Sequence, residues 1–416
     1  MNAFVEGKSL LKRVLGIPDP YGNFRRFKGR VHPRTLTRRD EIFAWAEAQV
    51  QDLARRESPE AYEASPDPLV RRGWELRGQA LVAFRNKCAG FGDLRVLVHT
   101  PPVSVSPAGA SLFDNLVQTL EYMGIPSRVL QWDESLSVVL ESFAPTVLMT
   151  SDHPLYLERL GWEALAAWRR ERPLLLGLTA SPSGEGLAPL AERLAWAGAH
   201  EVAFYYTFHS AEDVLCKGEY SPFRDVGEGV IPVEFGANIL QYYPVPGVVR
   251  DLDYVFLASS NRRKWSRYIG WLGDILSRES GFLDGPGWEF DGRTIMGSLP
   301  QDAQRYVYAR ARVGLNLHLE SQIKGVGELN ERTYQLAACG VPQLVDNAAL
   351  LPARFRAQGL YVASDPRQYA AHFKTILSQP EEAAGRALEA MDDVYRSHTL
   401  FHRAEGLVLR LWRLLQ

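Results

Sequence analysis

The sequence predicts an α/β protein with two consecutive parallel-sheet domains and a helical N-terminal extension. Short apolar runs alternate with helical stretches from Leu94 onward, pause at a Pro/Gly-rich linker near residue 245, and resume at Asp253. Strands spaced by helices form βαβ units, whose strands are parallel. Residues 1–90 lack this alternation. We therefore expect a helical, basic extension over 1–90, a first Rossmann-like domain over 91–245, a second over 246–395, and a C-terminal helix over 396–416 that can pack back on the first domain.

The helices of the extension follow from apolar spacing. Residues 40–53 place Phe43, Val50 and Leu53 at helical intervals, with Asp40 as N-cap. A Pro/Ser/Asp-rich break over 58–68 precedes a second helix, expected over 69–87.

The two domains are predicted element by element from apolar runs and the helical stretches between them. The first domain is expected to hold strands at 94–99, 146–149, 174–178 and 202–206, with helices at 112–123, 156–170 and 187–197. The second is expected to hold strands at 253–258, 288–290, 313–317, 343–345 and 360–362, with helices at 268–278, 301–310, 332–338 and 368–377. Residues 381–416 are expected to be helical.

Bulk composition narrows the class of protein. The 416 residues are 46% hydrophobic and 23% charged, as in soluble proteins, and the net charge of -2 gives no general attraction to nucleic acid. No run of about 18 apolar residues or signal-peptide pattern occurs. Cys88, Cys216 and Cys339 form no CxxC pair, which fits a reducing cytoplasm. We expect a cytoplasmic protein.

Positive charge is concentrated in residues 1–39. Ten Lys or Arg side chains are opposed only by Glu6 and Asp19, which leaves a net charge of +8 there and -10 on the remainder. Such a segment suits contact with an anionic membrane or polymer, and hence a place at the inner face of the membrane. The alternative is an arm that packs on an acidic neighbour.

The most informative stretch lies in the second domain. The apolar strand that ends at Asn316 leads through a polar loop, with His318 and Lys324, to a helix that opens with Asn330 and closes on Gly340. A loop and helix N-terminus between two parallel strands is where open α/β sheets hold phosphorylated ligands. Side chains of Arg332 and Gln335 are three residues apart and share one helix face.

This stretch resembles the C-terminal domain of the GT-B glycosyltransferases of the "glycosyl transferases group 1" set, and particularly its CgeB-like branch. The matching run is Glu331-Arg332-Thr333-Tyr334-Gln335-Leu336-Ala337-Ala338-Cys339-Gly340, and the tail His398-Thr399 to Arg403 matches that branch's ending. The resemblance extends over roughly 250–410, is topological over 94–245, and is absent over 1–90.

The resemblance implies a GT-B fold, with two Rossmann-like domains facing a cleft, and transfer of a sugar from a nucleotide-diphosphate sugar to a glycan, lipid, protein or small molecule. It implies an enzyme that needs no metal ion. The expected donor-binding residues are Ser260, Arg263, Lys264, His318, Lys324, Asn330, Glu331, Arg332, Tyr334 and Gln335.

Two positions depart from the pattern of the relatives. Gln335 stands where they carry the glutamate associated with the donor ribose, and Gly327 stands where they carry a paired glutamate. Gln can still bond two hydroxyls, although without charge assistance. Retention or inversion therefore stays open, as do two alternatives: a GT-B-fold nucleotide-sugar epimerase and a catalytically weakened nucleotide-sugar-binding protein.

Candidate acceptor-side residues follow the strands of the first domain. A hydroxyl acceptor that attacks directly needs a general base near neutral pH. Asp152 beside His153 is the preferred pair, with Asp152 alone as an alternative, and His99 and His209 occupy comparable positions.

Overall fold

The protein is described by a computed structural model that covers residues 27–28, 31–51, 57–103, 105–184, 186–216, 218–260, 264–290, 293–295 and 299–416. Its chain forms two compact units. Unit 1 comprises residues up to Ala80, Ile239–Gly325 and Leu329–Ser397, and unit 2 comprises Leu81–Asn238, Val326–Glu328 and His398–Gln416. Most of residues 1–39, including their first 26, and Arg263 lie outside the described residues.

Unit 2 is built on a six-stranded parallel sheet in the order β3-β2-β4-β5-β6-β7. Its strands are β2 (Val96–Thr100), β3 (Ser127–Gln131), β4 (Val147–Thr150), β5 (Leu175–Thr179), β6 (Phe204–Thr207) and β7 (Val230–Pro232). Its helices are α6 (Pro107–Tyr122), α7 (Leu136–Phe143), α8 (Pro154–Leu157), α9 (Trp162–Glu171), α10 (Leu190–Ala199), α11 (Ala211–Cys216), the 3₁₀ helix η2 (Gly218–Asp225) and α20 (Leu400–Leu415). β2, β4 and β6 are buried throughout, as expected for strands covered on both faces.

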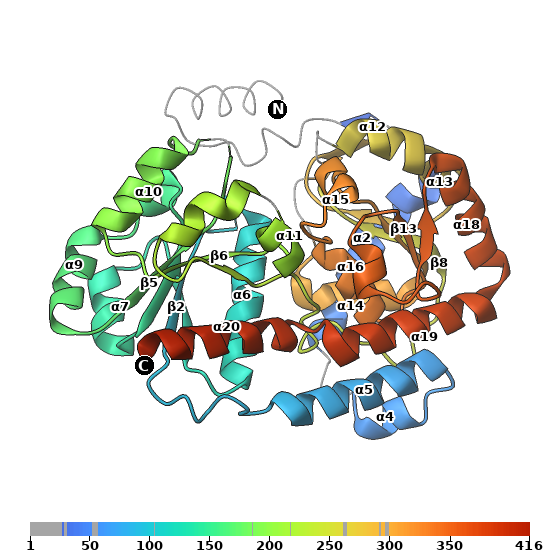
Figure 1. Ribbon diagram of the computed structural model, residues 1–416. Coiled ribbons are helices and arrows are strands. Elements are labelled where there is room, and N and C mark those ends of the chain that lie inside the picture. Colours follow the sequence, from blue (N-terminus) through green and yellow to red (C-terminus); the bar gives the residue numbers. More distant parts are fainter. Residues whose placement is uncertain are drawn as a thin grey trace. The chain divides into compact units, whose positions relative to one another are not determined.

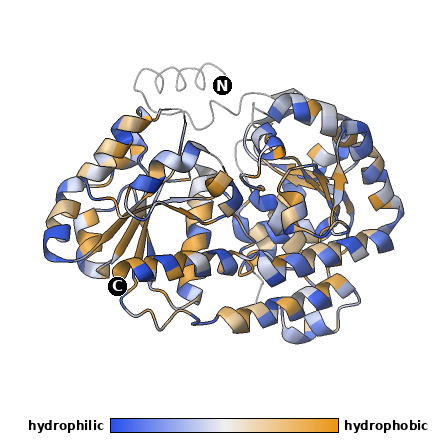
Figure 2. Cartoon of the chain, in the orientation of Figure 1, coloured by the Kyte–Doolittle hydropathy of each residue, from blue (hydrophilic) through white to orange (hydrophobic). Residues whose placement is uncertain are grey.

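Unit 1 is built on a five-stranded parallel sheet in the order β14-β13-β12-β8-β9. Its strands are β8 (Leu252–Leu257), β9 (Phe282–Asp284), β12 (Ala311–Asn316), β13 (Gln343–Asp346) and β14 (Tyr361–Ala363). Its helices are α2 (Pro33–Gln51), α4 (Pro59–Glu63), α5 (Pro68–Phe84, which continues into unit 2), α12 (Trp265–Arg267), the π-helix η4 (Tyr268–Leu272), α13 (Gly273–Arg278), α14 (Gln301–Arg310), α15 (Glu320–Lys324), α16 (Glu331–Ala338), α17 (Leu351–Arg354), α18 (Pro366–Ser378) and α19 (Pro380–Ser397). The strands β2, β4 and β5 of unit 2 are mostly hydrophobic, whereas the helices of both units mix hydrophobic and hydrophilic residues (Figure 2).

One expected strand belongs to a different sheet. β10 (Trp288–Phe290) pairs with β1 (Phe27–Lys28) and β11 (Arg293–Ile295), whereas the fifth strand of the main sheet is β9. The sequence predicted no strand at 282–284, and it is this segment, β9, that pairs with β8.

The N-terminal helices are part of unit 1, and ion pairs attach them to its sheet. Arg38 of α2 pairs with Asp251 at 2.7 Å, and Arg39 pairs with the buried Asp284 at 2.5 Å. For these two arginines, the interpretation of basic residues packed on acidic neighbours holds.

A buried polar cluster joins the segment before α4 to α14. The Glu57 carboxylate accepts hydrogen bonds from the hydroxyls of Tyr62 (3.0 Å), Tyr243 (2.8 Å) and Tyr306 (2.8 Å), and it pairs with Arg305. The side chains of Glu57 and Arg305 are 8% and 3% exposed. Removing either partner would leave an uncompensated buried charge.

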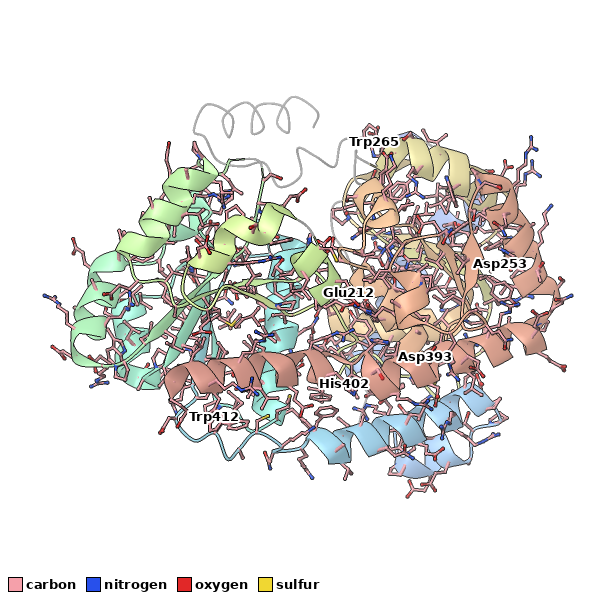
Figure 3. The ribbon with its side chains drawn as sticks, in the orientation of Figure 1. Glu212, Asp253, Trp265, Asp393, His402 and Trp412 are labelled. Carbon is pink, nitrogen blue, oxygen red and sulfur yellow. The ribbon has the colours of Figure 1, made fainter. Side chains whose placement is uncertain are left out.

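The C-terminal tail motif anchors α20 within unit 2. Thr399 pairs with Ala237 in an isolated parallel bridge, and Arg403 donates to the Phe235 carbonyl at 3.2 Å and contacts His398 Nδ1 at 2.9 Å. His402 and Trp412 both project from this helix (Figure 3), and α20 lies along α6 (Figure 1). These contacts give the motif a structural role.

Candidate functional site

The site in unit 1 lies where the sheet reverses its direction of growth. From β8 the chain adds β9 on one side and then β12 on the other. Ligands of open α/β sheets bind outside the carboxyl ends of the strands at such a switch point. Leu257 ends β8 and Asn316 ends β12, so these two residues mark the position.

Asn330 fixes the start of α16 beside this point. Its Oδ1 accepts hydrogen bonds from the Thr333 backbone N and Oγ1, both at 3.1 Å, and its Nδ2 donates to Asn316 Oδ1 at 2.8 Å. Asparagine is a preferred N-cap because its oxygen satisfies an otherwise unpaired helix donor. The helix N-terminus is thereby tied to the carboxyl end of β12.

Arg332 bridges the two strands of the switch point. Its Nε donates to the Leu257 carbonyl at 2.8 Å, its Nη1 donates to Asn316 Oδ1 at 3.2 Å, and its guanidinium lies 5.0 Å from the centre of the Phe256 ring. Among the described residues it has no carboxylate partner. A half-buried guanidinium held only by neutral groups keeps its charge available for an anion.

Asn316 is the hub of this arrangement and was not among the predicted site residues. It is fully buried, and its Nδ2 donates to Thr333 Oγ1 at 2.9 Å and to Gln343 Oε1 at 3.0 Å. All four of its side-chain bonds hold neighbouring site elements together. The asparagine at the end of an apolar strand was the sequence signal that could have identified it.

His318 is buried behind the loop, in a network with Asp346 and Arg267. His318 Nδ1 lies 2.6 Å from Asp346 Oδ1, and Arg267 pairs with Asp346 Oδ2 at 2.6 Å. Burial lowers the pKa of His318 despite the neighbouring carboxylate. Burial alone would raise the pKa of Asp346, but the hydrogen bond and charge of His318 together with Arg267 hold it below its ordinary value. The pair therefore positions the loop through an ionised Asp346.

The remaining predicted cations and Ser260 differ in their surroundings. Lys264 donates to the Leu317 carbonyl at 3.0 Å, which brings a second cation to the end of β12. Ser260 is buried and its Oγ accepts from Trp265 Nε1 at 2.9 Å. Lys324 is 73% exposed and pairs with Glu320 on α15.

Three further predicted residues lie on α16. Tyr334 is fully buried and its ring lies 5.8 Å from that of Phe355, so it packs the helix. Glu331 is half-buried in the first turn. The side-chain amide of Gln335 makes no hydrogen bond to any described residue, although the residue is only 8% exposed. This amide has both its donor and its acceptor available.

The first acceptor-side candidate, His99, spans the switch point of the unit 2 sheet. It is fully buried on β2, and its Nδ1 lies 2.9 Å from Thr150 Oγ1 at the end of β4. Burial lowers the pKa of His99 to about 4, so the ring is neutral near pH 7.

Asp152 and His153 follow β4 and have different environments. Asp152 is 3% exposed and its Oδ2 pairs with the buried Arg193 at 2.6 Å. Burial raises the pKa of Asp152, with Arg193 opposing the shift. His153 is half-buried and caps α8, because its Nδ1 accepts from the Leu155 backbone N at 3.3 Å. Of the two, His153 has the greater exposure.

His209 has a local partner of its own within unit 2. Its Nδ1 lies 2.7 Å from the buried Asp213 and 2.8 Å from the Tyr220 hydroxyl. The structure therefore gathers Asn330, Arg332 and Lys264 around the end of β12, while Asp152, His153 and His209 each belong to a separate local network.

The chain is similar to known proteins in sequence and in structure. Residues 271–408 match the family model of glycosyl transferase-like proteins, a segment that includes α16 and most of the unit 1 sheet. T4 phage β-glucosyltransferase, solved with UDP and Mn²⁺, has a similar structure, with a TM-score of 0.50, 9% identity, and coverage of 77% of this chain and 99% of that chain. The fold is GT-B.

Another similar structure is Anabaena HepE in complex with UDP and glucose, with a TM-score of 0.48, 11% identity, and coverage of 76% of this chain and 99% of that chain. No curated protein matches the sequence significantly. The predicted GT-B fold with two parallel-sheet domains and a helical N-terminal region is thereby confirmed.

Among the described residues, no helix is long and apolar enough to cross a membrane. No group of three or more His, Cys, Asp or Glu side chains arranged to hold a metal ion occurs in the same part of the chain.

Proposed function

We propose that the protein is a glycosyltransferase that moves a sugar from a nucleotide-diphosphate sugar to an acceptor hydroxyl. The observation that carries this proposal is the environment of Arg332. Its guanidinium has no carboxylate partner among the described residues, and it lies at the N-terminus of α16, where it bonds to the ends of both β8 and β12. The match of residues 271–408 to glycosyl transferase-like proteins supports the same interpretation.

In this proposal the leaving diphosphate is stabilised by fixed charge. Arg332, Lys264 and the first backbone N–H groups of α16 would bind the phosphate oxygens, since preorganised cations and helix N-termini stabilise charge that develops in a transition state. Asn330 and Asn316 would hold Arg332 in place. The free amide of Gln335 would bond the ribose hydroxyls. The positive side chains would neutralise the diphosphate in place of a metal ion, as the family resemblance implies.

Acceptor activation is assigned to the loop after β4. His153 would receive or orient the acceptor proton, because it is half-buried and adjoins the strand end. Asp152 would position this loop through its pair with Arg193. His99 is too deeply buried and its pKa too low for a base that cycles protons near pH 7.

Calorimetric titration with UDP-, GDP-, dTDP- and CMP-sugars tests the donor site. Arg332→Ala should weaken binding by about 1.5–3 kcal/mol, or roughly 10- to 150-fold in Kd, if the guanidinium pairs with a phosphate. Arg312→Ala is the matched control, because Arg312 is also partly exposed and donates to a backbone carbonyl, but at the amino end of β12. The proposal is refuted if none of these nucleotide sugars binds.

Turnover separates the proposal from its alternatives. Transfer to an acceptor pool supports the transferase, release of an isomerised sugar from donor alone supports the epimerase, and binding without turnover supports a weakened binding protein.

A further inference from the structure

The hydroxyl of Thr333 lies at the centre of the polar network at the end of β12. Thr333 is on α16 and is fully buried. Its Oγ1 lies 2.9 Å from Asn316 Nδ2, 3.1 Å from Asn330 Oδ1 and 3.2 Å from His318 Nε2. Because buried polar groups are nearly always hydrogen-bonded, these three neighbours decide how the hydroxyl is satisfied.

Two of the three hydrogen bonds have a fixed direction. Asn316 Oδ1 accepts from Asn330 Nδ2 at 2.8 Å and from Arg332 Nη1 at 3.2 Å. The Nδ2 of Asn316 therefore faces Thr333 and donates to its hydroxyl. Asn330 Oδ1 accepts from the Thr333 backbone N–H at 3.1 Å, so the same oxygen is an acceptor for the hydroxyl. With these two neighbours the hydroxyl receives one hydrogen bond and donates one.

The direction of the third hydrogen bond depends on the protonation state of His318. Its Nδ1 carries a proton, because it lies 2.6 Å from the Asp346 carboxylate. In the neutral ring Nε2 is then an acceptor, and it competes with Asn330 Oδ1 for the single proton of the Thr333 hydroxyl. In the doubly protonated ring, Nε2–H donates to the remaining lone pair of the hydroxyl, whose own proton stays with Asn330. Only the doubly protonated ring satisfies all three neighbours of the hydroxyl.

The charges around His318 make its protonation sensitive to a bound anion. The charged groups that face it are Asp346 of β13, Arg267 of α12, Lys264 at the start of α12 and Arg332 of α16. Burial lowers the pKa of His318, Asp346 opposes this shift, and the charges of Lys264 and Arg332 lower the pKa further. A phosphate bound to these two cations offsets their charge, so donor binding favours the protonated ring.

We propose that Thr333 is a positioning residue of the donor site, whose single hydroxyl proton couples the protonation state of His318 to the N-cap Asn330. When the phosphates bind, His318 takes up one proton from solvent and the Thr333 hydroxyl donates to Asn330. Asn330 and Asn316 then hold Arg332 against the diphosphate. The coupling to the donor rests on the proposed transferase function, whereas the competition for the hydroxyl proton does not. Thr333 itself makes no bond to the substrate.

Calorimetric titration of the full chain with UDP-, GDP- and dTDP-glucose tests the coupling, at about pH 6 and about pH 8, on either side of most of the ordinary titration range of histidine. The diphosphate of these ligands does not titrate in this range. The wild type should bind more tightly at the lower pH and take up protons. Proton uptake is measured as a binding enthalpy that varies with the ionisation enthalpy of the buffer.

Substitutions of Thr333 separate the hydroxyl from the rest of the side chain. Thr333→Val keeps a similar shape and removes the hydroxyl, so affinity at the lower pH should fall roughly three- to tenfold and proton uptake should disappear. Thr333→Ser keeps the hydroxyl and should retain both. Thr35→Val is the matched control, because Thr35 is a buried threonine of unit 1 whose hydroxyl accepts from the Gly281 backbone N–H at 3.1 Å, at the amino end of β9. This variant should keep the wild-type affinity and proton uptake.

Ring-nitrogen NMR of His318 in the wild type tests the same coupling without any change at Thr333. The ring should carry its proton on Nδ1 in the free protein and on both nitrogens after donor binding. The proposal is overturned if the ring stays neutral with donor bound, or if Thr333→Val retains the wild-type proton uptake. Donor binding and turnover without proton uptake would remove the coupling and leave the transferase function intact. A wild type that binds no nucleotide sugar would refute the transferase function and the coupling to the donor together.

Discussion

Glu57→Ala should destabilise unit 1 by about 3–5 kcal/mol, because breaking a buried ion pair leaves the other charge uncompensated. Arg305 is 3% exposed, so water cannot replace the lost carboxylate without opening the structure. The hydroxyls of Tyr62, Tyr243 and Tyr306 lose their shared acceptor at the same time. This contact joins the N-terminal segment to α14, so its loss should loosen the extension from the sheet.

Urea unfolding followed by far-UV circular dichroism measures this effect. A loss of that size should lower the unfolding midpoint by roughly 1 M or more, given urea m-values of about 1–3 kcal/mol/M. Glu63→Ala, at an exposed position in α4, is the control and should leave the midpoint near that of the wild type. The double variant Glu57→Leu/Arg305→Leu should regain much of the loss, because an apolar pair can replace a buried ion pair. A midpoint for Glu57→Ala equal to that of the wild type would refute the reasoning.

Three further outcomes are expected. The pKa of His99 is about 4 in the folded protein and 6.5 in the free side chain, so the unfolded state binds more protons between these two pH values. The free energy of unfolding therefore falls as the pH drops through this window, by about 3 kcal/mol in all. His99→Gln should flatten the pH dependence of the urea midpoint, and an unchanged slope would contradict this. Gln335→Glu should tighten nucleotide-sugar binding several-fold through charge-assisted bonds to the ribose, and Gln335→Leu should weaken it, so equal Kd values for all three would remove Gln335 from the site. Transfer activity should survive EDTA and show no requirement for Mn²⁺, and loss of activity that Mn²⁺ restores would show that the fixed cations are insufficient.

Local signals explain why the donor-side helix was predictable. Asn330 as N-cap and Gly340 as terminator are set by residues within a few positions of the helix ends. Apolar runs likewise predicted β8, β12 and β13, since buried parallel strands need apolar side chains on both faces. β3 was missed, because the polar Ser127, Arg128 and Gln131 interrupt the apolar run of this edge strand.

Long-range partners could not be predicted in the same way. Arg193 lies 41 positions after Asp152, and no periodicity links them, yet this pair buries Asp152 and limits its access to solvent. Asp284 similarly receives Arg39 from a helix 245 positions away. Sequence showed the charge of the N-terminal region, whereas only the fold shows where part of that charge is neutralised.

The switch points of the two sheets have different chemistry. In unit 1 the strand ends hold Arg332 and Lys264, which suits a ligand with charged phosphates. In unit 2 the corresponding strand ends hold a fully buried, neutral histidine packed against two aromatic rings. A transferase needs one site for an anionic leaving group and one for a neutral nucleophile. Under the proposed transferase function, we therefore expect the diphosphate of the donor to bind at the strand ends of unit 1.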